Sequence, residues 1–262
     1  MTWTTRPRSE IAGLAACVAG AGPNILLLHG VGLRAEAWGA QIDVLASSLR
    51  VTAPDMPGHG ESTLQQTDLA LADYVDAVAG VLETLEGPTV LAGHSMGAML
   101  ALAVAAQYPQ RIVGVVALNA VFERSEAAAQ AVEARAASLD GVTPADPRMT
   151  LERWFGTAAS PERAACQSWL TSIDPKGYKL AYTAFAHSRF PDRVSLEKLT
   201  CPALFVTGSL EPNATPKMSQ AMAALAPKGS AHIVEGAAHM MPMTHQDEVN
   251  ASLIAFAKRV LS

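Results

Sequence analysis

Residues 89–107 read TVLAGHSMGAMLALAVAAQ: a short apolar run, a serine flanked by glycines, and a long alanine-rich segment. The run 89–92 predicts a buried strand, and 98–107 predicts a helix. Between them GHSMG (93–97) fits Gly-x-Ser-x-Gly, in which two glycines allow a sharp strand-to-helix turn that exposes the serine hydroxyl. With the strand before it and the helix after it, this motif predicts that Ser95 is a nucleophile. The competing interpretation is a tight structural turn with a solvated serine.

Short apolar runs alternate with helical patterns on both sides of this motif. Strands are predicted at 24–28 (NILLL), 51–54, 112–118, 203–207 and 231–235, with an early strand in 11–17. Helices are predicted at 38–49, 69–85, 217–225 and 247–261. Strands that alternate with helices indicate an α/β fold, a mostly parallel sheet with helices on both faces.

The alternation stops between residues 120 and 195. This stretch is rich in Ala, Glu and Arg and is interrupted by prolines at 144, 147, 161 and 175. Such a composition predicts several short helices rather than further strands. We therefore predict a helical cap inserted at 120–195 into a core formed by 1–119 and 196–262.

Composition excludes several classes of function. The chain has 262 residues and a net charge of -5, and its 19 Lys and Arg form no basic run, so nucleic acid is not an expected partner. No apolar stretch approaches the roughly 20 residues that span a bilayer, so no membrane association is expected. Three widely separated cysteines (Cys17, Cys166 and Cys201) indicate neither a disulfide framework nor a thiolate metal site. A reducing, cytoplasmic location is expected, and the sequence predicts no oligomeric state.

A serine nucleophile needs a histidine base, and the base needs an acid to orient it. Among seven histidines, His239 follows a predicted strand and lies at its carboxyl edge, where open α/β sheets bind ligands. His245 is its rival. Glu211, in GSLEPNATP (208–216), follows the preceding strand and gives the chain order Ser95, Glu211, His239. The alternatives are that Glu211 is an exposed loop charge and that Glu123 is the acid.

Acyl transfer also needs hydrogen-bond donors for the oxyanion. Met96 N–H, at the start of its helix, is one candidate. Val31 N–H, in the HGVG turn at 29–32, is the other, because Gly30 and Gly32 would let the backbone approach substrate closely. A plain structural turn is the alternative interpretation of this segment. His94, inside the serine motif, is predicted to be a structural or pocket residue.

Together these motifs resemble the α/β-hydrolase superfamily over almost the whole chain. The oxyanion turn LHGVG (28–32), the loop DMPGHGES (55–62), the nucleophile elbow GHSMG (93–97), the acid turn GSLEP (208–212) and the histidine turn GAAH (236–239) occur in the family's order. Within it the chain is similar to 3-oxoadipate enol-lactonases and small esterases, including two cap segments, LERWF (151–155) and DPKGY (174–178). One departure is that the acid is usually Asp.

The resemblance implies a serine hydrolase that opens a small carboxylic ester or lactone through an acyl-enzyme, with no metal or cofactor. Ser95, His239 and Glu211 would form the triad, and Val31 and Met96 the oxyanion hole. Gly30, His94, the cap residue Trp154, and a cap arginine, Arg124 or Arg153, would contact substrate. Two alternatives remain: a C–C bond hydrolase of a vinylogous diketone, and a non-catalytic ligand-binding protein that keeps the same fold.

Overall fold

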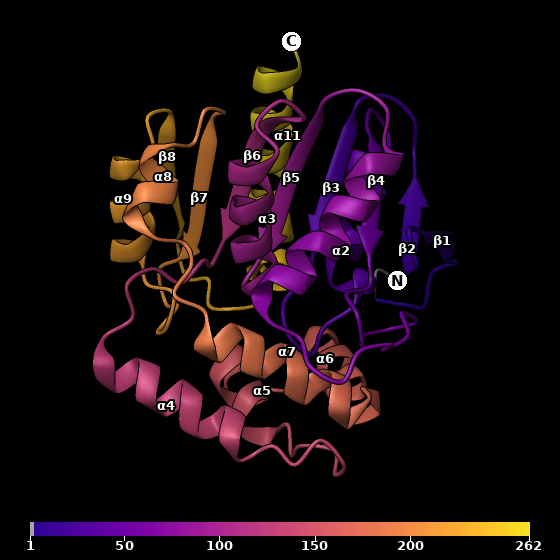
Figure 1. The fold of residues 1–262 in the computed structure, drawn as a ribbon, viewed down its shortest axis with the longest axis vertical. Helices are drawn as coiled ribbons and strands as arrows, with labels where there is room; N and C mark the ends of the chain where they lie inside the picture. The colour runs from indigo at the N-terminus through magenta and orange to yellow at the C-terminus, as the bar shows by residue number, and fades with distance from the viewer. Residues whose placement is uncertain (1–2) are drawn as a thin grey trace.

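The apolar runs of the sequence pair into one eight-stranded sheet in the computed structural model, which describes residues 3–262 (Figure 1). The strand order is β1-β2-β4-β3-β5-β6-β7-β8. β2 is antiparallel to both of its neighbours, β1 and β4. All other neighbouring strands in this order, including β3 with β4 and β5, are parallel. The strands are β1 (Ser9–Ile11), β2 (Leu14–Ala19), β3 (Asn24–Leu28), β4 (Arg50–Pro54), β5 (Thr89–His94), β6 (Ile112–Leu118), β7 (Ala203–Gly208) and β8 (Gly229–Val234). The predicted mostly parallel sheet is therefore confirmed.

The N-terminal segment differs from its prediction. The single early strand expected in 11–17 is an antiparallel hairpin, in which Ile11 pairs with Leu14. Ala12 and Gly13 form the turn with φ of +50° and +81°, and glycine makes this left-handed conformation accessible. The chain therefore reverses near the start of the predicted strand: Ile11 ends β1, and the rest of the run, from Leu14, lies in β2.

Alternate residues of each central strand pack on opposite faces of the sheet. Leu26 and Leu28 of β3 belong to one buried cluster, while Ile25 and Leu27 belong to another on the opposite face. This alternation follows from the two-residue period of a strand, and all four residues are fully buried, as expected for a strand covered on both faces.

Helices cover both faces. α2 (Leu71–Thr84), α3 (Met96–Gln107) and α9 (Pro216–Leu225) contribute to the first cluster. α1 (Gly39–Leu45) and α11 (Gln246–Leu261) contribute to the second. Short helical turns, η1 (Ala35–Trp38) and α10 (Met241–Thr244), lie beside α1. The predicted helix 38–49 is shorter than expected, because Trp38 belongs to the 3-10 segment and the α-helix runs only from Gly39 to Leu45.

The insert between β6 and β7 is helical, as predicted. It contains α4 (Glu126–Ala137), α5 (Arg148–Phe155), α6 (Pro161–Ser172), α7 (Pro175–His187) and α8 (Arg193–Glu197). The side chains of Ser160 and Asp174 cap α6 and α7, and prolines occupy the first positions of both helices, where no N–H is needed. In Figure 1 α4 to α7 lie together beyond the carboxyl ends of the strands, whereas α8 contacts α3 and α9 of the core.

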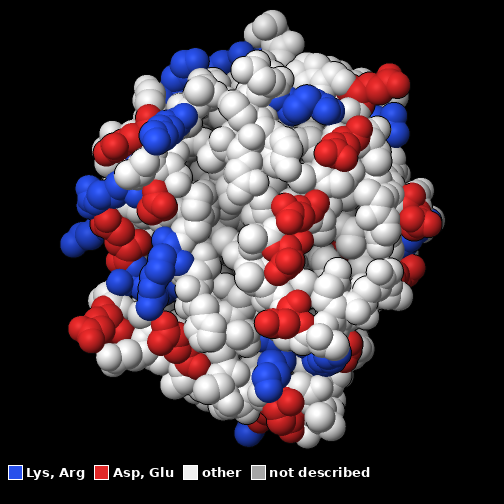
Figure 2. Space-filling view, in the orientation of Figure 1, with Lys and Arg blue, Asp and Glu red and all other residues white. Residues whose placement is uncertain are grey.

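The surface carries both signs of charge. Figure 2 shows Lys and Arg interspersed with Asp and Glu over the visible face, with no single basic field. Over residues 3–262, no helix combines the length and the apolar character that crossing a membrane requires.

Candidate active site

Ser95 lies in the turn between β5, which ends at His94, and α3, which begins at Met96. Its φ of +56° and ψ of -119° are rare for a non-glycine residue, and such strain is concentrated at functional sites. Both motif glycines are required by packing: a Cβ on Gly93 would overlap Gly97 O, and one on Gly97 would overlap Leu28 O. The half-buried Ser95 is therefore presented at the carboxyl edge of the sheet by a turn of the nucleophile-elbow type.

Glu211 and His239 meet across two loops at the same edge. The loop after β7 carries Glu211 and the loop after β8 carries His239, and Glu211 Oε2 lies 2.7 Å from His239 Nδ1. The Glu211 side chain is fully buried, and the His239 side chain is 13% exposed. The other oxygen, Oε1, accepts the N–H groups of Asn213 (2.8 Å) and Ala214 (3.3 Å). The carboxylate thus has partners on both oxygens and faces the ring nitrogen that an orienting acid must bind.

The environment of Glu211 favours its charged form. Burial by itself raises the pKa of this carboxyl, but the charge and hydrogen bond of His239, with the two backbone N–H groups, lower the pKa to about 2. Glu211 is therefore ionised at neutral pH.

The rival residues lie elsewhere. Glu123 is exposed and makes a two-point ion pair with Arg193, at 2.6 and 2.8 Å. His245 lies at the junction of α10 and α11, where its Nδ1 is 3.0 Å from Thr244 Oγ1. Neither has a hydrogen bond to Ser95, Glu211 or His239 among the described residues.

The backbone of His239 is held by two donors that the sequence did not reveal as a pair. His94 Nε2 lies 2.7 Å from His239 O, and Asn119 Nδ2 donates to the same oxygen at 2.8 Å. Asn119 Oδ1 also accepts Gly208 N–H at 3.4 Å. Asn119 is fully buried, follows β6 directly and has a φ of +50°. Its place just past a strand's carboxyl end was the available signal, but a lone asparagine there is unremarkable in sequence.

His94 is buried, and its pKa is lowered to about 3, because burial and the neighbouring His239 both disfavour the cation. Its ring centroid lies 4.8 Å from that of His239. Among the described residues the Ser95 hydroxyl makes no hydrogen bond. The contact between His239 and the turn that carries Ser95 is the hydrogen bond from His94 Nε2 to His239 O. Catalytic contacts of this kind often tighten only when substrate is bound.

The proposed oxyanion donors lie beside the elbow. A Cβ on Gly30 would lie 3.0 Å from Ser95 Cβ, so the turn 29–32 packs directly against the serine. Met96 is the first residue of α3, where backbone N–H groups have no intrahelical acceptor. No described residue accepts a hydrogen bond from Val31 N–H. Met96 N–H likewise has no acceptor within residues 3–262.

The cap closes over this edge. The indole of Trp154, in α5, stacks on His239 with centroids 5.4 Å apart. A Cβ on Gly32 would lie 2.5 Å from Leu170 Cδ2 and 3.0 Å from Tyr178 Cε2, so α6 and α7 rest on the oxyanion turn. Leu170 and Tyr178 were not singled out from the sequence, because apolar residues at helical spacing look alike whether they pack in a cap or over a site.

The cap arginines have different surroundings. Arg124 is half-buried, donates to Phe185 O and Ser188 O, and places its guanidinium 4.3 Å from the Phe185 ring centre. Arg153, on α5 beside Trp154, is exposed. No contact places either guanidinium at Ser95 among the described residues.

A cavity of about 550 Å³ adjoins the oxyanion turn at Gly32. Core residues 32–34, 58, 60 and 62–64 form one wall, and cap residues 169, 172–174 and 176 form the other; its lining includes Leu33, Arg34, Trp169 and Lys176. Within residues 3–262 no three His, Cys, Asp or Glu side chains are grouped to hold a metal ion. Cys17, Cys166 and Cys201 are buried, unpaired thiols.

An open, mostly parallel sheet, a strained serine after β5 and a buried acid–histidine pair together define a hydrolase of the α/β class. The family model described as "Alpha/beta hydrolase family" matches residues 25–252. The chain belongs to the α/β-hydrolase family.

Individual relatives span nearly its full length. It is 37% identical over 240 residues, 90% of this chain and 91% of the relative, to (E)-2-((N-methylformamido)methylene)succinate hydrolase from Acinetobacter baylyi. A thermophilic esterase from Thermogutta terrifontis, solved with malate bound, has a TM-score of 0.87 at 25% identity and covers 98% of this chain and 100% of its own. The enol-lactonase of Burkholderia xenovorans has a TM-score of 0.83 at 24% identity, over 96% of this chain and 100% of that one, and shows the shared fold.

Proposed function

We propose that this hydrolase is a serine enzyme that cleaves an acyl bond, in an ester, lactone or amide, of a small molecule. The observation that carries the proposal is the 2.7 Å contact between buried Glu211 Oε2 and His239 Nδ1, with Ser95 in a strained elbow at the same edge of the sheet. In this arrangement Ser95 is the nucleophile, His239 the general base, and Glu211 the acid that orients it.

The chemistry follows from these roles. Ser95 Oγ attacks the carbonyl carbon while its proton passes to His239 Nε2, and the carbonyl oxygen becomes an anion. The Val31 and Met96 N–H groups bind that oxygen, each donor contributing about 2.7 to 4 kcal/mol in comparable enzymes. The bond between the carbonyl carbon and the leaving oxygen or nitrogen then breaks, and the leaving atom takes the proton from His239. The acyl group remains bound to Ser95 as an ester. Water, deprotonated by His239, hydrolyses that ester and releases the acid.

The surroundings support secondary roles in the same scheme. Gly30 leaves room beside Ser95, and Trp154 covers the outer face of His239, where the acyl or leaving group would enter. The Nε2–H of His94 already donates to His239 O, and this bond favours a positioning role for His94 over direct contact with substrate. The Arg124 guanidinium could bind a substrate carboxylate only by sharing it with the carbonyls of Phe185 and Ser188.

A second candidate specifies the substrate as an N-acyl compound of a small dicarboxylate. The relative at 37% identity is named as a hydrolase of an N-methylformamido compound with a succinate skeleton, and this name supports amide cleavage as a candidate in addition to ester cleavage. The acyl-enzyme scheme is the same, with nitrogen as the leaving atom.

A substrate panel tests both proposals. Hydrolysis is measured for p-nitrophenyl esters of two to eight carbons, for small lactones, and for (E)-2-((N-methylformamido)methylene)succinate, with the wild type and Ser95→Ala. We expect turnover of at least one class by the wild type and its loss in Ser95→Ala with the fold retained by circular dichroism. Turnover preserved in Ser95→Ala would contradict the serine mechanism, and a preference for the ester panel over the amide would contradict the second candidate.

A further inference from the structure

The oxyanion turn is held by two buried histidines that the proposed mechanism does not use. We propose that His29 and His59 are positioning residues that fix the two peptide planes flanking Val31 and thereby aim Val31 N–H at the substrate oxyanion. This inference rests on the proposed function, because it concerns the same site, and it assigns a distinct hydrogen bond to each ring.

His29 fixes the peptide before Val31. Its Nδ1 lies 2.8 Å from Gly30 O, and Leu33 N–H donates to the same oxygen at 3.2 Å. In a trans peptide the N–H points opposite to the C=O of the same plane. Two donors that hold Gly30 O on one side therefore direct Val31 N–H to the other side, where no described residue accepts it.

His59 fixes the peptide after Val31. Its Nε2 accepts Gly32 N–H at 3.0 Å, and its Nδ1 lies 3.1 Å from Pro57 O. Gly32, with φ of +77°, has no side chain to restrict its backbone, so a hydrogen bond is the means of fixing its orientation. With both planes fixed, the backbone at Val31 cannot rotate its N–H away from the elbow.

The bonding partners determine the tautomer of each ring. A backbone N–H can only donate and a carbonyl can only accept, so Nε2 must be bare and Nδ1 must carry the proton in both histidines. Both rings are at most 1% exposed, and their centroids are 5.3 Å apart. Burial lowers the pKa of both, that of His59 to about 3, which agrees with neutral rings that serve as acceptors.

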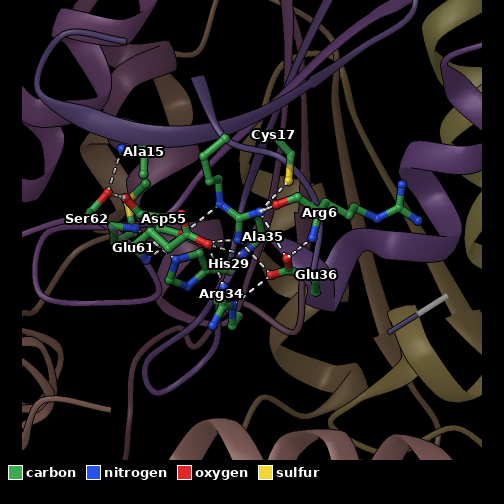
Figure 3. Close-up of polar contacts among 12 residues, drawn as sticks. Arg6, Ala15, Cys17, His29, Arg34, Ala35, Glu36, Asp55, Glu61 and Ser62 are labelled. Atoms are coloured by element: carbon green, nitrogen blue, oxygen red, sulfur yellow. Dashed lines mark hydrogen bonds and ion pairs between the residues drawn. The ribbon is translucent and has the colours of Figure 1, made fainter. Parts of the chain in front are cut away.

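The frame behind the histidines is rigid. His29 Nε2 accepts Met56 N–H at 2.9 Å, and Met56 follows Asp55, whose carboxylate accepts Ala35 N–H at 2.7 Å and binds Arg8 Nε at 2.9 Å. Figure 3 shows His29 beside Asp55, Ala35 and Glu36 of this buried network. Arg8 also donates to Glu36 Oε2 at 2.7 Å. The loop that carries His59 therefore begins at two residues, Asp55 and Met56, that are held by hydrogen bonds.

Paired amide substitutions separate positioning from simple packing. Asn carries its amide nitrogen as many bonds from Cα as histidine Nδ1, and Gln carries its amide group as far as Nε2. His29→Asn retains the donor to Gly30 O and His29→Gln loses it, whereas His59→Gln retains the acceptor for Gly32 N–H and His59→Asn loses it. All four variants remove an aromatic ring. Within each pair one variant can keep only the bond at the Nδ1 position and the other only the bond at the Nε2 position (to Met56 N–H in His29 and to Gly32 N–H in His59), so the comparison shows which of the two bonds matters for turnover.

We expect opposite preferences at the two positions. Measured on the best ester of the panel, kcat falls about tenfold or more in His29→Gln and His59→Asn, with KM changed less than about threefold, and stays within about threefold of wild type in His29→Asn and His59→Gln. Thermal unfolding midpoints are recorded for all four. A packing role would lower both members of a pair equally and in proportion to lost stability, and that result, or equal kcat within both pairs, overturns the inference. If the His29 variants do not fold, the His59 pair decides.

A second measurement needs no turnover. Imidazole ¹⁵N spectra of the wild type should show Nδ1 protonated and Nε2 bare in His29 and His59, and amide exchange at Gly32 should be faster in His59→Asn than in His59→Gln. The opposite tautomers, or equal exchange, would overturn the positioning role. Failure of the proposed function looks different: wild-type turnover is absent or survives Ser95→Ala, whatever these spectra show.

Discussion

The indole of Trp154 and the imidazole of His239 stack with their centroids 5.4 Å apart and their planes at 22°. The first residue comes from the cap and the second from the core, so this contact joins the insert to the proposed catalytic base. Trp154 is 8% exposed and belongs to the apolar cluster that links α5, α6 and α7 to Leu33 and Met240. The contact makes the cap part of the site rather than a cover placed over it.

Removing this ring should affect both activity and stability. In Trp154→Ala we expect kcat/KM to fall about tenfold, because His239 loses the indole that shields it from water and limits its motion. The free energy of unfolding should fall by about 3 to 5 kcal/mol. Trp154→Phe keeps a stacking ring and should be intermediate in both. Steady-state kinetics and urea unfolding measure the two effects. Wild-type kinetics in Trp154→Ala would show that the cap residue Trp154 does not contribute to catalysis.

The acid assignment gives a paired prediction. Glu211→Gln keeps the shape but loses the charge that stabilises the imidazolium, so kcat should fall by about a hundredfold or more. The matched control is Glu123→Gln, which removes an exposed ion pair with Arg193 and should leave kcat within about twofold. A Glu211→Gln enzyme with near-normal kcat, or a loss confined to Glu123→Gln, would move the acid away from Glu211.

Glu211 also predicts how stability depends on pH. Its pKa is lowered from 4.5 to about 2, so the fold favours the charged form. The resulting contribution is full above about pH 4.5, is lost as the pH falls towards 2, and is on the order of 3 kcal/mol. The free energy of unfolding of wild type minus that of Glu211→Gln, measured by urea at pH 6, 4 and 3, should therefore shrink as the pH falls. A difference that stays constant or grows would contradict the assigned shift.

Asn119 should matter through its bond to His239 O. Asn119→Asp replaces the donor with a carboxylate oxygen that faces a carbonyl, and kcat should fall about tenfold or more. Asn119→Gly removes the amide while relieving the positive φ, so it separates strain from hydrogen bonding. We expect Asn119→Gly to remain folded with reduced kcat. Full kcat in Asn119→Gly would show that the clamp on His239 is dispensable.

The buried ion network should be costly to break. The Arg8 side chain is 5% exposed and binds Glu36 and Asp55, which are 1% and 0% exposed. Arg8→Met removes the cation shared by two buried carboxylates, so that Asp55 loses its ion pair and Glu36 keeps only Arg34; it should lower the free energy of unfolding by about 3 to 5 kcal/mol. Arg148→Met removes an exposed pair with Asp146 and should change it by less than about 1 kcal/mol. Equal effects in urea unfolding would contradict the assigned burial.

Much of the fold could be predicted because its signals are local. The strand 112–118 has the predicted bounds, and the order of strands and helices is as expected from alternating apolar periods. The N-terminal hairpin was missed because a single left-handed pair of residues, Ala12 and Gly13, reverses an otherwise continuous apolar run.

The residues of the candidate site also differ in how far the sequence predicts them. Ser95 and the order of Glu211 and His239 could be predicted because turn glycines and strand ends leave marks in the sequence. The bonds of Asn119 to His239 O and of His59 to Gly32 N–H could not, because each joins segments far apart in the chain. The cap contacts of Leu170 and Tyr178 are hidden for a different reason: packing against a glycine needs only an apolar surface, which many residues supply.

Covalent labelling of Ser95 tests the proposed serine nucleophile most directly. The folded protein is incubated with a fluorophosphonate, and intact-mass and peptide mass spectrometry count and locate the adduct. We expect one adduct per chain on the peptide that contains Ser95, none in Ser95→Ala, and an unchanged adduct in Ser209→Ala, which alters a half-buried serine in the loop that carries Glu211. Absence of an adduct on the folded wild type, or an adduct that persists in Ser95→Ala, would contradict it.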